Sequence, residues 1–298
     1  WRFGTSYTVI ASSVLTTALG SDFGIAASPG FMKTADYRLE VTATSDECFN
    51  YADSDGKTDG DASAVLSWFA AKTGNGAYIN KQFFENPDDP NLRITGEALI
   101  QQDEGRMAGI ALIWLSQCTY KINTPLPLAW HGKGHVPIVV FRENKEDKHQ
   151  FYLATKGGSG LISHGNMDAG SFIFELNGVR WSVDPGNQNY YPLNKIGFQL
   201  SNSKQESERW TLLTKNNFGH SVITINNSLF QVSGSARVID FKEGKKPEAT
   251  LDLTELYGDN IKSVHRKFIK ESNQSLMIED QFEINDGTKL ITWQMMTV

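Results

Sequence analysis

Hydrophobic residues follow two different periods along the chain, and the change between them predicts two structural regions. From 5 to 20, apolar residues recur at the spacing of a helix that buries one face, and Gly20 follows as a natural end. A second helix is predicted over 61–74, opening on an Asp N-cap and closing on a glycine. A third, over 105–117, is apolar on most faces and is expected to be buried. Residues 1–120 are therefore expected to be helical, with long polar connections.

Prolines and glycines interrupt the pattern in "KINTPLPLAWHGKGH" (121–135), and after this stretch the hydrophobic period becomes two. Short runs of β-branched and aromatic residues then follow one another, at 135–143, 149–155, 171–184, 220–234, 235–242, 263–271, 275–284 and 289–296. The dipeptides "NG" at 177–178 and "DG" at 286–287 predict hairpins. Many short strands without helices between them predict an antiparallel β-sandwich. The expected organisation is a helical domain over 1–125 and a sandwich over 126–298.

Composition narrows the classes of function. The 298 residues carry a formal net charge of -6 and contain no long run of Lys and Arg, which argues against a nucleic-acid partner. No stretch has the roughly 18 to 20 apolar residues of a membrane helix, so no membrane partner is expected. The two cysteines, Cys48 and Cys118, do not form a disulfide framework and are expected to be buried thiols. An ordinary globular protein with a packed core is predicted.

Both ends of the chain fall inside predicted elements. The first residues, "WRFGTSYTV", enter the helical pattern at once, and the last, "LITWQMMTV", lie within a predicted strand. We therefore expect the chain to be a fragment of a longer protein, with an incomplete C-terminal sandwich.

Four polar side chains stand out in the β-rich half, namely His164, Asp168, Asp184 and His220. His164 lies in "SHGNMDAGS", where a histidine among glycines either is solvated, bonds to the backbone, or serves a site. His164 and His220 are 56 residues apart in sequence, and only sheet packing could bring them together. No zinc-protease, P-loop, nucleophile-elbow or dinucleotide motif accompanies them.

The segment "SHGNMDAGSFIFELNGVRWSVDPGNQNYY" resembles the heparinase II/III-like family of polysaccharide lyases, whose hallmark reads roughly S-H-G-H-x-D-A-G-S-F, then G-x-x-W, then D-x-G. "GTSYTV", "FNYADS", "WHGKGH", "VVFRE" and "NNFGHSVITIN" extend the resemblance over most of the chain. The resemblance implies a partial (α/α) toroid followed by an antiparallel β-sandwich, which agrees with the change of period. It also implies a periplasmic or secreted location.

The chemistry that the resemblance implies is β-elimination on a uronic-acid polysaccharide of the glycosaminoglycan or alginate type. Such an enzyme neutralises the uronate carboxylate, removes the weakly acidic C5 proton with a base, and protonates the departing O4 oxygen. His164 matches the first histidine of the hallmark and is the expected catalytic histidine. Tyr7 is a candidate for the catalytic tyrosine, and packing of this side chain within the toroid is the alternative. The group that neutralises the carboxylate is expected upstream of this chain.

Several relatives carry a divalent metal, typically zinc, at positions that correspond to Asn166, Asp184 and His220. An amide oxygen is a poor zinc ligand beside an imidazole nitrogen, so Asn166 departs from the pattern. Three alternatives follow: His164 joins the site, a harder ion is held by oxygen ligands, or the cluster is an empty polar junction between strands. A bound metal would have a structural role.

Substrate contacts are expected from cations and histidines near the hallmark or the domain joint, namely Arg142, Arg180, His131 and His135. Asp168 and Ser171 are expected to shape the turn through hydrogen bonds to the backbone, and Gly165 and Gly170 to supply positive φ.

Two functions from other classes remain open at the level of sequence. One is a non-catalytic carbohydrate-binding or scaffold protein that has lost part of the machinery, for which Asn166 is the argument. The other is a glycoside hydrolase, which needs two carboxylates flanking the scissile bond. Asp53 and Asp55 in "YADSDG" offer the pair, and a turn is the simpler interpretation of that loop.

Overall fold

The chain forms two compact units that do not follow a single division of the sequence. The structure, a computed structural model, describes residues 1–56, 60–79, 107–117, 119–144 and 147–297. One unit comprises Trp1–Glu40 and Thr58–Leu126, and the other comprises Val41–Lys57 and Pro127–Val298. The expected division into 1–125 and 126–298 therefore misses a segment of the early chain that belongs to the second unit.

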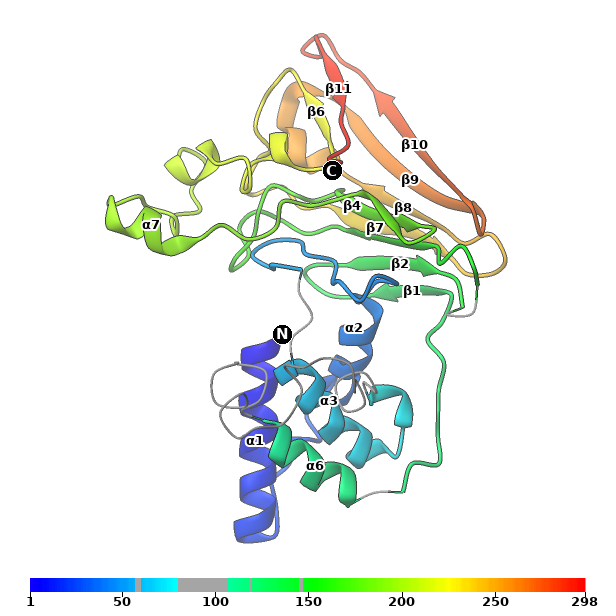
Figure 1. Cartoon of the computed structure of the whole chain (residues 1–298). Helices are drawn as coiled ribbons and strands as arrows, with labels where there is room; N and C mark the ends of the chain where they lie inside the picture. Colours follow the sequence, from blue (N-terminus) through cyan, green and yellow to red (C-terminus); the bar gives the residue numbers. More distant parts are fainter. Residues whose placement is uncertain (57–59, 80–106, 118, 145–146, 298) are drawn as a thin grey trace. The chain divides into compact units, whose positions relative to one another are not determined.

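The first unit is helical in its described part (Figure 1). Its elements are α1 (Arg2–Leu19), η1 (Phe31–Lys33), α2 (Thr34–Glu40), α3 (Gly60–Thr73), η2 (Gly76–Tyr78) and α6 (Ala108–Ser116). The α3 helix packs against both α1 and α6. Its core contains Trp68 and Phe69, whose rings meet edge to face at 5.0 Å, with Phe31 at 5.5 Å from Phe69. Aromatic burial of this kind stabilises a helical unit by several kcal/mol in total, at about 1.5–3 kcal/mol for each buried ring.

Helix ends agree with the expectations from glycine positions. Gly20 caps α1 in the left-handed conformation with φ 77°, and its N–H donates to the Thr16 carbonyl at 3.0 Å. Gly74 follows α3 with φ 70° and donates to the Ala70 carbonyl at 2.8 Å. The α6 helix differs from the prediction, because Leu112 and Ile113 are each 56% exposed within this unit. A run that is apolar on all faces therefore buries only part of its surface here.

The second unit contains antiparallel sheets (Figure 1). Its strands are β1 (Ala129–Gly132), β2 (Ile138–Arg142), β3 (Tyr152–Lys156), β4 (Phe172–Leu176), β5 (Val179–Ser182), β6 (Ile223–Ile225), β7 (Arg237–Lys242), β8 (Glu248–Asp252), β9 (Ser263–Ser272), β10 (Ser275–Glu283) and β11 (Ile291–Trp293). The sheet orders are β1-β2-β3-β4-β5, β10-β9-β8-β7 and β11-β6. This agrees with the antiparallel architecture predicted from the period of two.

Turn chemistry predicts one of the two hairpins correctly. Asn177 and Gly178 both have positive φ, at 55° and 75°, and join the paired strands β4 and β5 as the "NG" signal requires. At the "DG" site the Thr288 N–H donates to the Asn285 carbonyl at 3.0 Å, so a turn is present. However, β10 pairs with β9 whereas β11 pairs with β6, so this turn joins two different sheets and the predicted hairpin is wrong.

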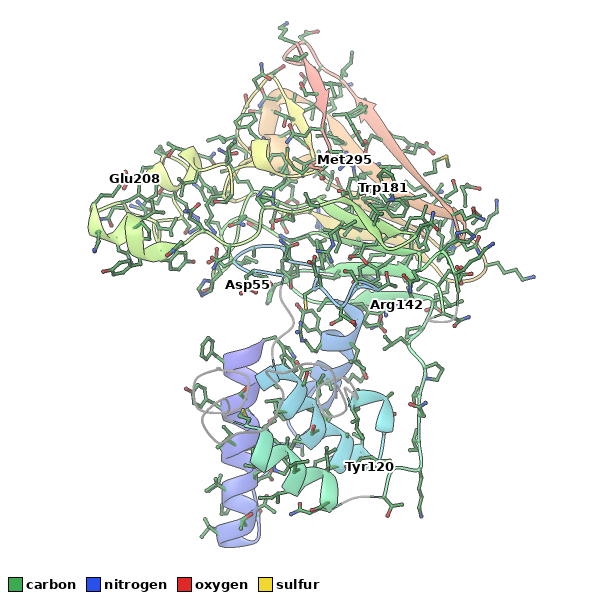
Figure 2. All side chains as sticks on the ribbon, viewed as in Figure 1. Asp55, Tyr120, Arg142, Trp181, Glu208 and Met295 are labelled. Carbon is green, nitrogen blue, oxygen red and sulfur yellow. The ribbon has the colours of Figure 1, made fainter. Side chains whose placement is uncertain are left out.

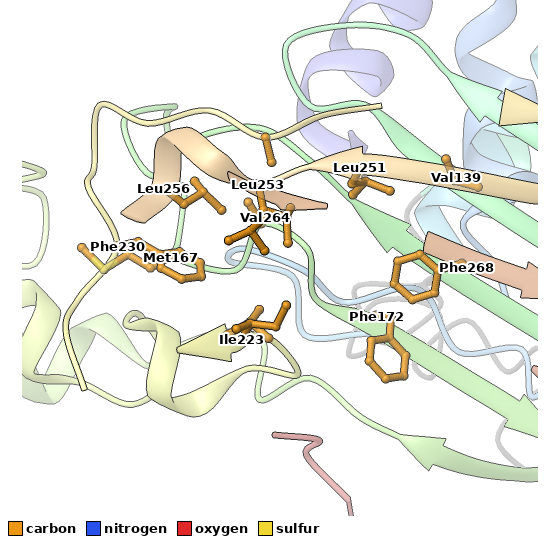
Figure 3. Packing of buried hydrophobic residues seen from close by; sticks show 14 of the residues in the cluster. Val139, Met167, Phe172, Ile223, Phe230, Leu251, Leu253, Leu256, Val264 and Phe268 are labelled. Atoms are coloured by element: carbon orange, nitrogen blue, oxygen red, sulfur yellow. The ribbon is translucent and has the colours of Figure 1, made fainter. Parts of the chain in front are cut away.

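A hydrophobic core joins the two larger sheets (Figure 3). Phe172 of β4 meets Phe268 of β9 edge to face, with ring centroids 5.6 Å apart, and both side chains are buried. Leu251 of β8 and Val139 of β2 belong to the same cluster, which brings side chains from both sheets into one interior. Packing of two antiparallel sheets over a shared core is consistent with a β-sandwich.

The segment Val41–Lys57 is bound to the sheets through polar contacts. Glu175 of β4 accepts hydrogen bonds from the Ser45 N–H at 3.0 Å and from the Thr44 hydroxyl at 2.9 Å. The Asn50 side chain donates to the Asp184 carbonyl at 2.8 Å. These bonds cross more than 100 residues of sequence, and they bring a loop from the early chain beside the hallmark segment.

Between β5 and β6 the chain leaves the sheets and forms an arm that contains α7 (Tyr190–Lys195) and η3 (Glu208–Thr211) (Figure 1). We refer to residues 187–211 as the α7 arm. Glu208 lies on this arm, apart from the exposed Trp181 of β5 (Figure 2). The arm was not predicted from the sequence, and it forms one wall of the candidate site.

Candidate active site

His164 lies in the loop between β3 and β4, and its imidazole contacts an aspartate from the early chain. The His164 Nδ1 is 2.7 Å from the Asp53 Oδ2. The Tyr190 hydroxyl donates to the same Asp53 oxygen and lies 3.4 Å from His164 Nδ1, while the Lys215 ammonium forms an ion pair with Asp53 Oδ1. The Asp53 carboxylate therefore binds three donors. The His164 side chain is 65% exposed, so its other ring nitrogen is accessible.

The backbone of this loop departs from the prediction that Gly165 would have positive φ. It is His164 that adopts the left-handed conformation, with φ 60°, a costly choice for a residue with a Cβ. Gly165 is required for space instead, because a Cβ there would lie 2.7 Å from the Ile162 side chain and 2.9 Å from its carbonyl oxygen. Gly170 has φ 82°, as predicted. The glycines thus allow the strained turn that presents His164.

Burial and hydrogen bonding have opposing effects on the pKa values of the groups around Asp53. Burial alone would raise the pKa of Asp53, but the hydrogen bonds from Lys215, Tyr190 and His164 lower it below its ordinary value. Burial lowers the pKa of Lys215, and the charge of Asp53 opposes that effect. Burial and the hydrogen bond to Asp53 raise the pKa of Tyr190, so this phenol stays protonated at neutral pH. Asp53 is an anion here and cannot be the protonated acid that a glycoside hydrolase would need.

A pocket of about 530 Å³ lies between His164 and the α7 arm. Its lining residues are His164, Tyr190, Asn194, Gly197, Phe198, Gln199, Leu200, Ser201 and Arg209. The lining combines an accessible imidazole, a protonated phenol, amides and one guanidinium. This composition suits a polar ligand, and it places proton-transfer groups at the wall of the pocket.

Asp184 and His220, which the resemblance implied as metal ligands, form a buried pair. The His220 Nδ1 is 2.9 Å from Asp184 Oδ2, and both side chains are fully buried. The other Asp184 oxygen accepts the Gly186 N–H at 2.9 Å. Burial alone would lower the pKa of His220, but the charge and hydrogen bond of Asp184 raise it above its ordinary value, and the charge of Asp168 adds to this effect. His220 Nε2 has no hydrogen-bond partner among the residues that the structure describes.

The predicted metal ligands do not form a coordination site. Asn166 turns its amide nitrogen toward the Ala52 carbonyl at 3.0 Å, and its amide oxygen lies 3.4 Å from an Arg209 nitrogen. The Asp184 and His220 side chains bond to each other, so Asn166 is the ligand position that is engaged elsewhere. Within the described ranges, no three His, Cys, Asp or Glu side chains are grouped so that they could hold a metal ion. The donor set therefore does not fit a zinc ion.

A second buried ion pair lies close to this histidine. The Lys156 ammonium of β3 pairs with Asp168 Oδ1, and both side chains are completely buried. Asp168 Oδ2 accepts the Ala52 N–H at 3.0 Å, so its side chain bonds to a distant backbone segment and not to its own turn as predicted. Burial raises the pKa of Asp168, but the charges of Lys156 and His220 lower it below its ordinary value.

The two arginines predicted to contact substrate are occupied by other parts of the protein. Arg142 is 9% exposed, and its guanidinium lies 5.3 Å from the centre of the Tyr152 ring. Arg180 pairs with Glu175 at 2.7 Å and with Glu47 at 3.1 Å. Neither arginine lines the pocket beside His164. Their placement argues against the predicted role.

The remaining predicted residues lie away from the pocket lining or in the other unit. His131 of β1 packs on Phe241 with ring centroids 5.3 Å apart, and burial, with the charge of Lys133, lowers its pKa. His135 is exposed in the bend after β1. Tyr7 is 68% exposed on α1 of the first unit. The roles of these three residues stay predictions.

Comparison with known proteins identifies the family. The family model described as heparinase II/III-like, C-terminal, matches residues 138–296, which is more than half of the chain. The chain belongs to the heparinase II/III-like family. None of the curated proteins compared with this sequence matches it.

Solved structures of a heparan sulfate lyase and a heparinase III share the fold at low sequence identity. The heparan sulfate lyase HepC of Pedobacter heparinus matches with a TM-score of 0.58 and 15% identity, covering 93% of this chain and 37% of that one. A HepC mutant gives a TM-score of 0.59 with 14% identity over 94% of this chain and 37% of that one. A heparinase III, the BT4657 gene product, gives 0.53 with 13% identity, covering 93% and 37%. This chain thus spans little more than a third of the length of the structures it matches.

Within this heparinase-like chain, three residues of the site were missed by sequence reasoning. The sequence around Asp53 favours a turn, and Tyr190 and Lys215 carry no local signal of a site. The Asp53 contacts span 111 residues to His164 and 162 residues to Lys215. The pairing of Asp53 with the hallmark histidine could have been suspected only from the two negative charges of "YADSDG".

Two further findings concern membrane-spanning helices and thiols. Among the described helices, none is both long and apolar enough to cross a bilayer. Cys48 is a buried thiol, as expected, and Cys118 lies outside the described residues.

Proposed function

We propose that this protein is a polysaccharide lyase that cleaves a uronate-containing glycosaminoglycan by β-elimination. The observation that carries the proposal is the Asp53–His164–Tyr190 arrangement at the wall of a polar pocket. Family membership supports lyase chemistry, and the related solved structures include heparan sulfate lyases. An alginate-type uronate polymer is the alternative substrate, because the proposed chemistry requires only the uronate.

His164 fits the role of base. With Asp53 accepting at Nδ1, the neutral imidazole carries its proton on Nδ1, and the Nε2 lone pair is free to take the C5 proton of the uronate. The electron pair of the C5–H bond then forms the C4–C5 double bond, and the C4–O4 bond breaks with its electrons on O4. Asp53 stabilises the imidazolium that results, because it remains an anion.

Tyr190 fits the role of acid for the departing O4 oxygen. Its raised pKa keeps the phenol protonated, and its hydroxyl belongs to the same cluster as the imidazole. Arg209 lines the same pocket and brings positive charge to an anionic substrate. Tyr7 remains the competing tyrosine, so Tyr190→Phe and Tyr7→Phe are compared under identical conditions. The assignment to Tyr190 requires that only the first change lowers kcat strongly.

The decisive experiment is His164→Ala in the full-length protein, assayed by the ultraviolet absorbance of the unsaturated uronate product on a panel of uronate polysaccharides. Loss of about 10²–10⁴-fold in turnover with an unchanged melting temperature is expected. His149→Ala is the matched control, because His149 also bonds through Nδ1, to Asn177 at 2.7 Å, on the same unit. Retention of full activity in His164→Ala would overturn the proposal. Sugar binding without product by the wild type would favour a non-catalytic carbohydrate-binding protein.

We also propose that the helical unit is the C-terminal part of an (α/α) toroid and that the protein is periplasmic or secreted. The match to HepC over 93% of this chain, including the helical unit, supports the first proposal. Cell fractionation of the source organism tests the second, and a purely cytoplasmic protein would contradict it. Metal binding is not part of the proposed chemistry, since Asn166, the third predicted ligand, bonds to the Ala52 carbonyl and faces Arg209.

A further inference from the structure

Ala52, the residue immediately before Asp53, is held from both sides by the hallmark segment. Its N–H donates to Asp168 Oδ2 at 3.0 Å, and its carbonyl accepts the Asn166 amide at 3.0 Å. Ala52 adopts the left-handed conformation with φ 56°, which costs about 1–2 kcal/mol for a residue with a Cβ. The two hydrogen bonds therefore hold an unfavourable backbone conformation whose next residue is Asp53.

Asn166 is itself fixed on its other side. It is 1% exposed, and its Oδ1 lies 3.4 Å from a nitrogen of Arg209. The same Arg209 nitrogen donates to the Gly165 carbonyl at 2.5 Å, and the other terminal nitrogen donates to the Leu200 carbonyl at 2.6 Å. One guanidinium thus joins the His164 loop, the Asn166 side chain and the pocket wall.

Residue 166 needs a donor and an acceptor on one short, uncharged side chain. The donor reaches the Ala52 carbonyl, and the acceptor faces Arg209. An aspartate of the same shape would keep the acceptor and lose the donor, leaving the buried Ala52 carbonyl facing a carboxylate. A histidine would carry its two nitrogens on a rigid ring that does not reproduce the amide geometry.

We propose that Asn166, at the hallmark position that the resemblance assigns to a metal ligand, is a positioning residue that sets Asp53 against the His164 imidazole. It acts through Ala52, and a direct hydrogen bond replaces coordination at this position. The His164 ring is 65% exposed and is otherwise held by Asp53 and Tyr190, so its orientation depends on where Asp53 lies. This inference rests on the proposed function for its kinetic consequence, but not for its structural one.

The test compares Asn166→Asp with Asn217→Asp in the full-length protein. Asn217 is a matched control, because it is fully buried, donates to the Ser228 carbonyl at 3.1 Å and accepts the Phe230 N–H at 3.1 Å. Each change removes a buried amide donor that bonds to a backbone carbonyl. Only Asn166→Asp removes the bond to Ala52. Nitrogen-15 NMR of the His164 imidazole reports the fraction of the neutral ring that carries its proton on Nδ1.

In Asn166→Asp, we expect that fraction to fall and kcat to fall by about 10–100-fold, with KM within about twofold of the wild type. In Asn217→Asp, we expect a comparable loss of melting temperature with the tautomer fraction and kcat unchanged. An unchanged tautomer fraction in Asn166→Asp, or an equal shift in Asn217→Asp, would overturn the proposal.

A second variant and the NMR readout keep the two proposals separable. If Asn166→Asp does not fold, Asn166→Ser provides the same readouts without a buried charge. If the wild type shows no lyase activity, the proposed function fails, while the tautomer comparison still decides whether Asn166 positions Asp53. Loss of activity in Asn166→Asp with an unchanged tautomer fraction would count against positioning and leave the proposed function intact.

Discussion

Replacement of Lys156 by Met is expected to destabilise the second unit strongly. The Lys156 ammonium and the Asp168 carboxylate form an ion pair in which both side chains are completely buried. Methionine keeps most of the side-chain volume but removes the charge, leaving the Asp168 carboxylate with His220 and the Ala52 N–H as its remaining partners. Breaking a buried pair from one side costs about 3–5 kcal/mol. For a unit of this size, that loss corresponds to a fall of about 6–20 °C in melting temperature.

Removal of the second charge should recover much of this loss. The double variant Lys156→Met with Asp168→Asn leaves no uncompensated charge, so it is expected to be more stable than Lys156→Met alone, with a coupling energy of about 1–3 kcal/mol. Calorimetric unfolding of the wild type, both single variants and the double variant completes the cycle. Lys246→Met is the surface control, because its pair with Glu271 is solvent-exposed and is expected to contribute at most about 1 kcal/mol. Additivity of the two buried changes within about 0.5 kcal/mol would refute the reasoning.

Three other predictions test the surroundings of the site. Hydrogen bonds and the Lys215 charge lower the pKa of Asp53 in the folded protein. The Asp53 carboxylate should therefore contribute fully to stability above about pH 4, the pKa of an unfolded Asp, and this contribution should disappear as pH falls through the folded pKa. Melting temperatures of wild type and Asp53→Asn should accordingly converge in acid. Gly219→Ala should cost at least about 1–3 kcal/mol in urea unfolding, since a Cβ would lie 1.9 Å from the Leu213 carbonyl oxygen, whereas the open Gly4 should accept Ala without loss. A chelator should leave the melting temperature unchanged, and a stoichiometric ion lost together with stability would contradict the misfit of the Asp184 donors.

Sequence patterns predicted much of the fold, because helix periodicity and turn formation depend on residues that are neighbours in sequence. The spacing of apolar residues located α1, and Asn177 with Gly178 marked the β4–β5 turn through positive φ. The β1 strand was hidden by the prolines and glycines around Ala129–Gly132, which locally resemble a linker. The arm helix α7 has only six residues, too few for a hydrophobic period to be recognised.

The sequence predicted the site residues that lie in recognisable motifs, but not the residue that contacts His164. The hallmark pattern pointed to His164 and Asp184, and the later match in "NNFGHSVITIN" pointed to His220, which the structure pairs with Asp184 at 2.9 Å. The partner of His164 could not be identified, because Asp53 meets it through a side-chain contact between segments more than 100 residues apart. Periodicity reports which face of an element is buried and carries no information about which distant loop meets a given turn.

The excursion of Val41–Lys57 into the second unit makes that unit a discontinuous domain. The chain crosses between the two units after Glu40, again after Lys57 and a third time after Leu126. A truncated protein that begins at Pro127 would retain every named strand, yet it would lack the acidic partner of His164 and leave Asp168 and Asn166 without Ala52. Excising the sheets for separate expression would therefore remove the carboxylate on which the proposed base depends. The site is complete only after Asp53 meets His164, 111 residues later in the sequence. Contacts between residues so far apart in sequence form slowly in folding.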